Sequence, residues 1–481
     1  MLLRDLGDVR DLLARHRGTV LGVGMTAYSR MVPGYFLNTY CQVALRNTRD
    51  LTLLQERNPV FCLEQQVGEP LLEKGLNSAR LLEHPLVKSF LRTLPDPKYL
   101  FLYQNYAELE ALSEKEGWIP MANSACLRTR MADRGFFEEM CTRLGLRKVP
   151  GGIYALKTIH DRPYDFWSKM LGPALVVQLP EIIQGGGRGT FYIRSGEEYE
   201  AIKGRLKGNA WRGISLNRVS LHRFLEGVPV SLALCITRHG VLISRLQRQL
   251  IDLPYCRGLS EKGIFCGHEW TRSAWPEKVE EDAIFQARQI AEYLGRLSFR
   301  GVFGIDFLID DRRSQVFPIE INPRFTGAFP MLSLLHMKDG LIPFEAFHLL
   351  EFLDLPYEID LEGMNEAYES PLEGSHLLLF LSRRGNTVRR GLEAGLYEKS
   401  CETGRIFFVK KALDYGAILN QRQFLLVDGP PAAVGGVLPS DDPLYRVGRL
   451  LFPHGALDET GSLSPEVLST VEWAYEMILG G

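Results

Sequence analysis

The chain has 481 residues, too many for one ordinary hydrophobic core, so its length indicates roughly two to four structural units. Its 56 basic and 58 acidic residues leave a formal net charge of -2, and no long basic run stands out, so we expect no nucleic-acid partner. Residues 1–18 mix charges into apolar positions, and no apolar run approaches the roughly 18 residues of a membrane span. We therefore expect neither a secretory signal nor a membrane association.

The eight cysteines are scattered, and no two of them form a CxxC pair. Cys256 and Cys266 lie near His268, but their spacing is not that of a zinc knuckle and no fourth ligand follows. Reduced thiols are the simpler interpretation, which favours a cytoplasmic protein.

The first part of the chain alternates short apolar runs with helical patterns. Strands are predicted at 19–24, 59–64, 99–105 and 118–123, and a helix is predicted at 106–117. Strands that alternate with helices indicate a parallel α/β layer.

The middle and last parts of the chain mix strands and helices differently. An amphipathic helix is predicted within 131–152, and a long helix opened by Pro276 is predicted at 276–297. Strands are predicted at 173–180 and 190–195, joined by a glycine-rich connection, and further strands follow up to residue 251. The runs "RIFFVKKAL" and "QFLLVDG" predict a mixed α/β unit after about residue 355.

The stretch "GVFGIDFLIDDRRSQVFPIEINPRF" (301–325) places two acids inside apolar runs. If it forms a hairpin centred on Arg313, Asp306 and Glu320 lie directly opposite each other, with Cβ atoms roughly 4.5–5.5 Å apart, where like charges repel. Asn322 and Arg324 follow on the same face as Glu320 because strand side chains alternate. Two carboxylates and an amide predict a magnesium site that leaves room for phosphates and water. A solvated polar face on an edge hairpin is the alternative.

The pattern "GIDFLID…VFPIEINPR" resembles the signature of the ATP-grasp superfamily, of the carboxylate–amine ligase type, and the resemblance covers roughly residues 125–335. It implies that Asp306, Glu320 and Asn322 hold magnesium, with manganese as an alternative ion, between the phosphates of ATP. It implies that Arg324 stabilises the transition state. The implied architecture is an α/β (α+β) ATP-grasp fold: an N-terminal α/β pre-grasp domain (1–124), an ATP-grasp domain (125–350, with lobes at about 125–222 and 223–350), and an additional C-terminal α/β domain (351–481).

The resemblance also implies a set of nucleotide contacts. "QGGGRGT" (184–190) matches the family's glycine-rich lid over the phosphates, although a hairpin tip would explain the glycines equally well. "HRFLEGVPVSL" (222–232) resembles the linker that clamps the adenine, the alternative being a strand with a turn at Gly227. The candidate nucleotide-binding residues are Arg134, Gln178, Gly185, Gly186, Gly187, Arg188, Gly189, His222, Phe224, Leu225 and Glu226.

Several positions depart from the family's pattern. Gln178 stands where the family usually carries a phosphate-binding Lys, and Arg134 stands in place of another Lys. His222 replaces the acid that accepts from the adenine, and Pro229 replaces the ribose-binding acid. Gln178 still has donors for phosphate oxygens, and Arg188 could supply the missing charge.

The implied reaction is the activation of a carboxylate by ATP as an acyl phosphate, followed by attack of an amine and release of ADP and phosphate. Arg248 and Arg300 are candidates for phosphate or acyl-phosphate contacts, or else belong to solvated strand faces. The expected substrates are a small carboxylate and an amine, with amino acids or peptides favoured, and a homodimer is compatible with these expectations. A nucleotide-binding protein without turnover and a carboxylate–thiol ligase are the alternative functions.

Overall fold

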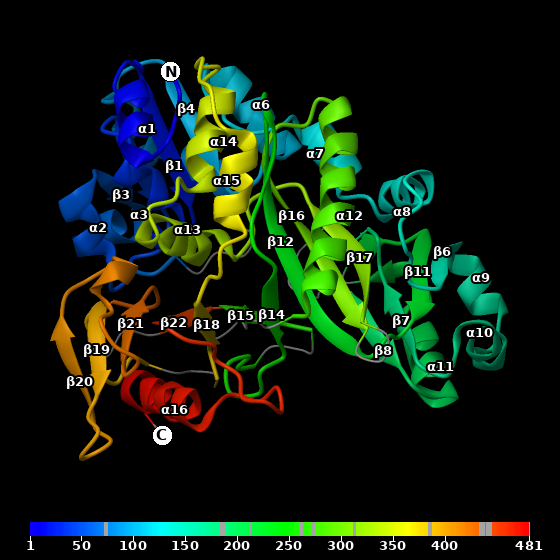
Figure 1. Ribbon diagram of the computed structural model, residues 1–481. Helices are drawn as coiled ribbons and strands as arrows, with labels where there is room; N and C mark the ends of the chain where they lie inside the picture. Colours follow the sequence, from blue (N-terminus) through cyan, green and yellow to red (C-terminus); the bar gives the residue numbers. More distant parts are fainter. Residues whose placement is uncertain are drawn as a thin grey trace.

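The computed structural model describes residues 1–71, 76–181, 189–211, 213–259, 263–271, 275–310, 314–382, 387–431, 438 and 445–480. The protein combines helices with parallel and antiparallel sheets, which confirms the predicted α/β (α+β) class (Figure 1). Within these ranges, no helix has both the length and the apolar character needed to span a membrane.

The N-terminal domain is built on a parallel sheet in the order β3-β2-β1-β4-β5. Its central strand β1 is buried along its whole length, as expected for an apolar run inside a parallel sheet. The predicted strand at 59–64 is shorter than expected because helix α3 begins at Leu63. The elements are α1 (Leu6–Leu13), β1 (Thr19–Gly24), β2 (Tyr40–Ala44), α2 (Leu51–Arg57), β3 (Val60–Cys62), α3 (Leu63–Val67), α4 (Ser78–Glu83), α5 (Pro85–Arg92), β4 (Lys98–Leu102), α6 (Ala107–Glu116) and β5 (Ile119–Pro120).

The first lobe follows and is organised around an antiparallel sheet in the order β6-β11-β7-β8. In Figure 1 it lies on the opposite side of the molecule from the N-terminal domain. Asp133 caps α8 by accepting from the Phe136 N–H at 3.0 Å, so the helix begins at Arg134. The elements are α7 (Ala125–Met131), α8 (Arg134–Arg143), β6 (Gly151–Ala155), α9 (Leu156–Asp161), α10 (Tyr164–Leu171), β7 (Leu175–Gln178), β8 (Thr190–Ile193), α11 (Gly196–Arg205), β9 (Ala210–Trp211), β10 (Ile214–Ser215) and β11 (Arg218–Arg223).

The second lobe contributes the strands β12 to β17 to a long sheet. The order of that sheet is β17-β16-β12-β14-β15-β18-β22-β21-β19-β20, and β13 pairs with β12 beside this path. Helix α12 has the predicted position. The elements of the lobe are β12 (Gly227–Thr237), β13 (Gly240–Ile243), β14 (Gln247–Ile251), β15 (Phe265–Trp270), α12 (Glu277–Arg296), β16 (Gly301–Asp310), β17 (Gln315–Asn322), α13 (Phe329–Lys338) and α14 (Phe344–Phe352).

The C-terminal strands continue this sheet across the predicted boundary at residue 350, because β15 pairs with β18. The C-terminal part therefore shares its sheet with the second lobe, and helix α16 covers it (Figure 1). Its elements are α15 (Leu361–Tyr368), β18 (Gly374–Phe380), β19 (Gly395–Lys399), β20 (Ile406–Lys410), β21 (Gln423–Val427), β22 (Arg446–Phe452) and α16 (Pro465–Leu479).

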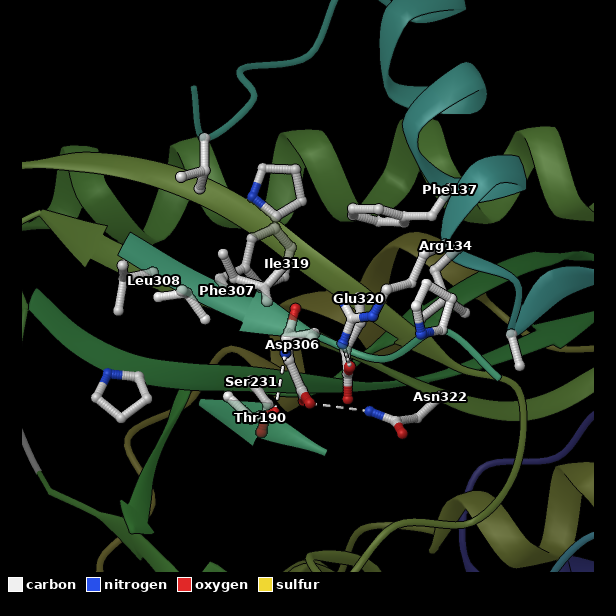
Figure 2. A pocket seen from close by; sticks show the side chains of 18 of the residues that line it. Arg134, Phe137, Thr190, Ser231, Asp306, Phe307, Leu308, Ile319, Glu320 and Asn322 are labelled. Carbon is white, nitrogen blue, oxygen red and sulfur yellow. Dashed lines mark hydrogen bonds and ion pairs between the residues drawn. The ribbon is translucent and has the colours of Figure 1, made fainter. Parts of the chain in front are cut away.

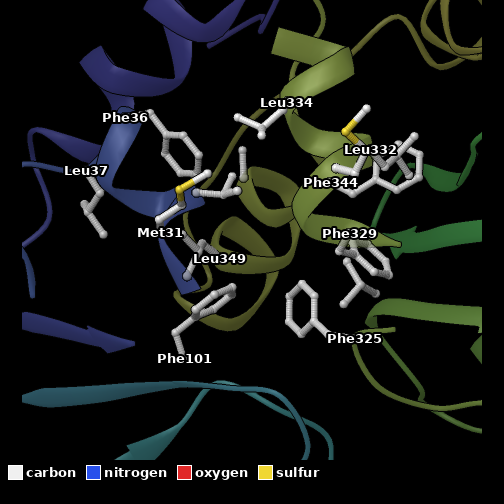
Figure 3. Packing of buried hydrophobic residues seen from close by; sticks show 14 of the residues in the cluster. Met31, Phe36, Leu37, Phe101, Phe325, Phe329, Leu332, Leu334, Phe344 and Leu349 are labelled. Atoms are coloured by element: carbon white, nitrogen blue, oxygen red, sulfur yellow. The ribbon is translucent and has the colours of Figure 1, made fainter. Parts of the chain in front are cut away.

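Aromatic packing fixes the N-terminal domain against the segment that follows β17. Figure 3 shows Phe36 and Phe101 on the N-terminal side of a buried cluster and Phe325 and Phe329 on the other side. The rings of Phe101 and Phe325 meet edge to face with centroids 5.0 Å apart. Because Phe101 lies in β4, this contact brings the carboxyl end of the parallel sheet to the end of β17.

Candidate functional site

A cleft of about 860 Å³ lies between the two lobes and reaches the N-terminal domain. This volume suits a small-molecule ligand. Its walls come from β7, β8 and β11 on one side and from β16 and β17 on the other. Phe224–Glu226 connect β11 to β12 and so link the sheets of the two lobes, as the linker prediction required.

The acids of the hairpin lie on the floor of this cleft. Asp306 on β16 pairs directly with Glu320 on β17, which confirms the predicted pairing of the two acids. The register shifts immediately after this pair, so that Pro318 rather than Ile319 faces Phe307. Such β-bulges are common beside active sites, and the edge position of β17 tolerates a proline without an N–H.

Hydrogen bonds connect the polar side chains on this floor. Asn322 donates from Nδ2 to Asp306 Oδ2 at 2.9 Å, and Gln249 donates from Nε2 to Asp306 Oδ1 at 2.9 Å. Arg324 donates from Nη2 to Asn322 Oδ1 at 2.9 Å. Arg134 reaches from α8 to Glu320, with 3.0 Å between Nη2 and Oε2 (Figure 2). The floor is thus a continuous network of two carboxylates, two amides and two guanidinium groups.

The electrostatics of the pair fit a hard cation. Burial raises the pKa of Asp306 well above its usual range, and the facing Glu320 carboxylate raises it further. A divalent cation between the carboxylates would remove this repulsion, and two carboxylates with an amide oxygen are a donor set that magnesium accepts. The described residues contain no group of three or more His, Cys, Asp or Glu that could hold a metal ion.

Five of the seven predicted nucleotide contacts that the structure describes line the same cleft. Gln178 lies at the end of β7, and its Nε2 donates to Thr190 Oγ1 at 3.3 Å. His222 pairs with Glu138, with 3.1 Å between Nε2 and Oε1, so this position carries a neighbouring acid. The predicted site residues that line the cleft are Arg134, Gln178, His222, Phe224, Leu225, Asp306, Glu320, Asn322 and Arg324.

Other predicted residues lie elsewhere. Residues 185–188 (Gly185, Gly186, Gly187 and Arg188) lie outside the described residues. Gly189 has a φ of +79° and its carbonyl accepts from the Leu179 N–H at 3.1 Å, which places it in the connection between β7 and β8. Gly189 and Glu226 are not among the described residues that line the cleft.

The structure places Arg248 and Arg300 away from the cleft, so the geometry does not support their predicted contacts. Arg248 pairs across the sheet with Glu269, at 3.7 Å, because it points to the opposite face from Gln249. Arg300 donates from Nη1 to the Glu351 carbonyl at 3.0 Å, and its guanidinium lies 4.5 Å from the Phe352 ring centroid.

Sequence reasoning missed several residues of the cleft. Gln249 alternates with Arg248 along β14, so the sequence shows that one of the two faces the hairpin but not which one. The others come from elements that only the tertiary fold brings together. They are Tyr103, Arg128, Lys148 and Arg218.

This fold and site define a two-lobed α/β protein whose interlobe cleft carries an acid pair beside arginines. Residues 185–328 match the family model of the ATP-grasp domain. No curated protein matches the sequence.

Solved structures of low sequence identity share the fold over nearly the whole chain. The biotin carboxylase domain of 2-oxoglutarate carboxylase from Hydrogenobacter thermophilus, in complex with MgADP, ADP and bicarbonate, is 12% identical with a TM-score of 0.59, over 96% of this chain and 91% of that chain. An N5-carboxyaminoimidazole synthase from Aspergillus clavatus, in complex with ADP and a ribonucleotide, is 13% identical with a TM-score of 0.53, over 95% and 99%. An L-amino acid ligase from Bacillus licheniformis is 11% identical with a TM-score of 0.56, and the match covers 96% of this chain and 98% of that chain. The centre of the chain thus matches the ATP-grasp domain, and the fold of the chain over nearly its whole length is similar to that of these solved structures.

Proposed function

We propose that the protein is an ATP-dependent, ADP-forming ligase that joins a carboxylate to an amine. The observation that carries this proposal is the paired Asp306 and Glu320, linked by hydrogen bonds to Asn322 and Arg324 at the floor of the interlobe cleft. The structural relatives include proteins with bound MgADP and ADP and an amino acid ligase. We also propose the division into domains 1–124, 125–350 and 351–481, with the C-terminal domain extending the sheet of the second lobe.

The residues of the cleft divide the work of the reaction. Phe224 and Leu225 in the linker would hold the base, and Gln178 and Arg134 would contact phosphates. Asp306, Glu320 and Asn322 would hold magnesium, which supplies neutralisation of the phosphate charge. Arg324 would hold the acceptor carboxylate in line with the γ-phosphorus.

Two displacements complete the reaction. A carboxylate oxygen attacks the γ-phosphorus and the bond from phosphorus to ADP breaks, which gives an acyl phosphate. The amine then attacks the acyl carbon, phosphate leaves with the bonding electrons, and the amine releases a proton. In this proposal the fixed charge of Arg324 would offset the charge that develops on the transferred group and on the tetrahedral oxyanion.

The rival function is nucleotide binding without turnover. The neutral Gln178 favours it, because this side chain brings no charge to the phosphates. Thiol as the second acceptor is the other alternative, and it shares the acyl-phosphate step.

The experiment that separates these functions is ADP release with hydroxylamine present. Purified protein with MgATP receives pooled amino acids and small carboxylates, and hydroxylamine traps an acyl phosphate as a hydroxamate even when the natural amine is absent. The Glu320→Gln variant, purified identically, controls for contaminating ATPases. Acid-dependent ADP and hydroxamate that the variant does not form support the ligase, whereas MgATP binding without either product supports the rival.

A further inference from the structure

Arg128, on α7, is a buried cation that reaches the cleft from the N-terminal side. Arg128 is 7% exposed, and it lines the cleft together with Tyr103 and Arg324. Nη2 donates to Gln104 Oε1 at 2.7 Å, whereas Nε has no hydrogen-bond partner among the described residues. A neutral amide therefore holds the guanidinium in place, and the Nε–H donor remains without a hydrogen-bond partner among the described residues.

A second guanidinium stands next to it. Arg324 donates to neutral oxygens, those of Asn322, Phe325 and Tyr103, and its guanidinium lies 5.0 Å from the Tyr103 ring centroid. Burial lowers the pKa of Arg128, and the charge of Arg324 lowers it further. The two guanidinium groups therefore repel each other in a partly buried part of the cleft.

No other charged side chain among the described residues of the cleft forms an ion pair with these two arginines, although the charge of Arg324 acts on the pKa of Asp306. Arg134 is paired with Glu320 at 3.0 Å, Arg218 with Asp133 at 2.9 Å, and His222 lies 3.1 Å from Glu138. Over the part of the chain that the structure describes, neither Arg128 nor Arg324 has a carboxylate partner at ion-pair distance. A water molecule could satisfy a free donor, but it would leave the two charges unneutralised. Buried charges are normally paired, so this arrangement suits an anionic ligand.

We propose that Arg128 and Arg324 form a two-arginine site for the carboxylate of the acid substrate, and that Arg128 recognises this anion before phosphoryl transfer. The inference rests on the proposed function, in which Arg324 faces the reacting carboxylate. Planar guanidinium groups hold a carboxylate through paired hydrogen bonds that fix its orientation. The site also lies at the carboxyl end of β4, the edge where open parallel sheets bind ligands.

The apolar side chains that line the cleft beside this site favour an organic acid over bicarbonate as the ligand. Gly327 lies three residues beyond Arg324, and a Cβ there would be 2.7 Å from a Phe265 ring carbon, so that ring closes the wall. Ile251, the cross-strand partner of Phe265, also lines the cleft and is 37% exposed. This apolar surface would cover the carbon skeleton of an acid whose carboxylate lies between the arginines.

Thermal denaturation without nucleotide tests the site directly. The probes are acetate, isobutyrate and benzoate, compared with bicarbonate, inorganic phosphate and chloride at equal ionic strength. The variants are Arg128→Gln and Arg128→Lys. The matched control is Arg130→Gln, which removes an exposed arginine of the same helix whose guanidinium lies 5.4 Å from the Phe136 ring centroid.

The organic acids should raise the melting temperature of the wild type and of Arg130→Gln alike. Arg128→Gln should need on the order of 10- to 100-fold more acid for the same shift, as expected for loss of a charge-assisted hydrogen bond, and Arg128→Lys should fall between. In the ADP-release assay, Arg128→Gln should raise KM for the acid by a similar factor and leave KM for ATP unchanged.

Equal shifts in the wild type and Arg128→Gln overturn the proposal, and so does a wild type that no organic acid stabilises. A shift with phosphate or bicarbonate alone overturns the assignment to an organic carboxylate. If Arg128→Gln does not fold, the comparison of Arg128→Lys with the wild type decides. Failure of the ligase proposal is recognised separately, because absent acid-dependent ADP release would leave the nucleotide-free melting shifts in place.

Discussion

Replacement of Glu320 with Gln removes one of two facing charges while it keeps the shape of the side chain. The Glu320 side chain is 40% exposed and that of its partner Arg134 is 21% exposed. An ion pair with this exposure contributes about 0–1 kcal/mol to stability, since solvent screens it. The substitution also removes the repulsion that raises the pKa of Asp306, which acts in the opposite direction. We therefore expect the free energy of unfolding to change by less than about 1 kcal/mol.

Turnover should respond far more strongly than stability. The neutral amide would weaken magnesium binding exactly where phosphate charge must be neutralised, so ADP formation should fall by on the order of a hundredfold or more. Raising the magnesium concentration should recover part of the activity, because the remaining ligands Asp306 and Asn322 still offer oxygens.

The assay is ADP release against magnesium concentration, with thermal melting of the same samples. Glu139→Gln is the matched control, since Glu139 is an exposed acid paired with Arg143 at 3.1 Å on α8. Wild-type turnover of Glu320→Gln at low magnesium would refute the assignment of Glu320 as a metal ligand. Lost turnover that accompanies a lost melting transition would instead show that the residue supports the fold.

Three other predictions concern separate features of the chain. Arg324→Lys should leave ATP affinity nearly unchanged and cut turnover by on the order of a hundredfold, because Lys cannot copy a bidentate fork; calorimetric ATP binding beside ADP release checks this, and a strong binding loss with unchanged turnover per bound nucleotide would contradict it. Residues 184–190 should gain protection from hydrogen exchange when MgATP binds, and equal protection in both states would argue that the glycines form only a turn. Burial raises the pKa of Glu345 to about 7, although the hydrogen bond that Ser333 Oγ donates to its carboxylate at 2.6 Å lowers the pKa in part. The unfolded chain ionises more readily, so the wild type should lose about 3 kcal/mol of stability as pH rises from about 4.5 to about 7. Glu345→Gln should not show this loss, and denaturant unfolding at pH 4 and pH 8 that gives parallel changes in both proteins would contradict the prediction.

The acid hairpin was predictable because its register is a local property. A short turn joins two alternating runs, a count from Arg313 sets Asp306 opposite Glu320, and the structure has this pairing. The bulge after the pair was not predictable from the same count. On the turn side of the bulge the pairing runs one residue off the count from Arg313, with Gln315 opposite Asp310 and Pro318 opposite Phe307. The bulge restores the count, so that Asp306 meets Glu320.

The assignment of Arg248 shows where residue type misleads. Its positive charge led to the prediction of a phosphate contact. Side chains alternate along β14, however, so Arg248 pairs with Glu269 and its neighbour Gln249 donates to Asp306. The face of a strand could be chosen only once the pairing of β12 with both β14 and β16 was known, because that pairing decides which side meets the hairpin. Arg300 was misassigned for a similar reason, since its partners lie on α14.

The proposed acid-recognition side of the cleft depends on contacts that no local pattern encodes. Tyr103 follows a strand of the N-terminal domain, whereas Arg324 follows β17, and the packing of Phe101 on Phe325 brings the two segments together. Phe101 is two positions before Tyr103, and Phe325 directly follows Arg324; both rings belong to a buried apolar cluster that the sequence shows only as hydrophobic residues. A change in this packing would move Tyr103 relative to Arg324 without altering the register of the acid hairpin. The separation implies that substrate choice and phosphate chemistry can vary independently in this fold, because the first depends on how the N-terminal domain docks and the second on the register of one hairpin.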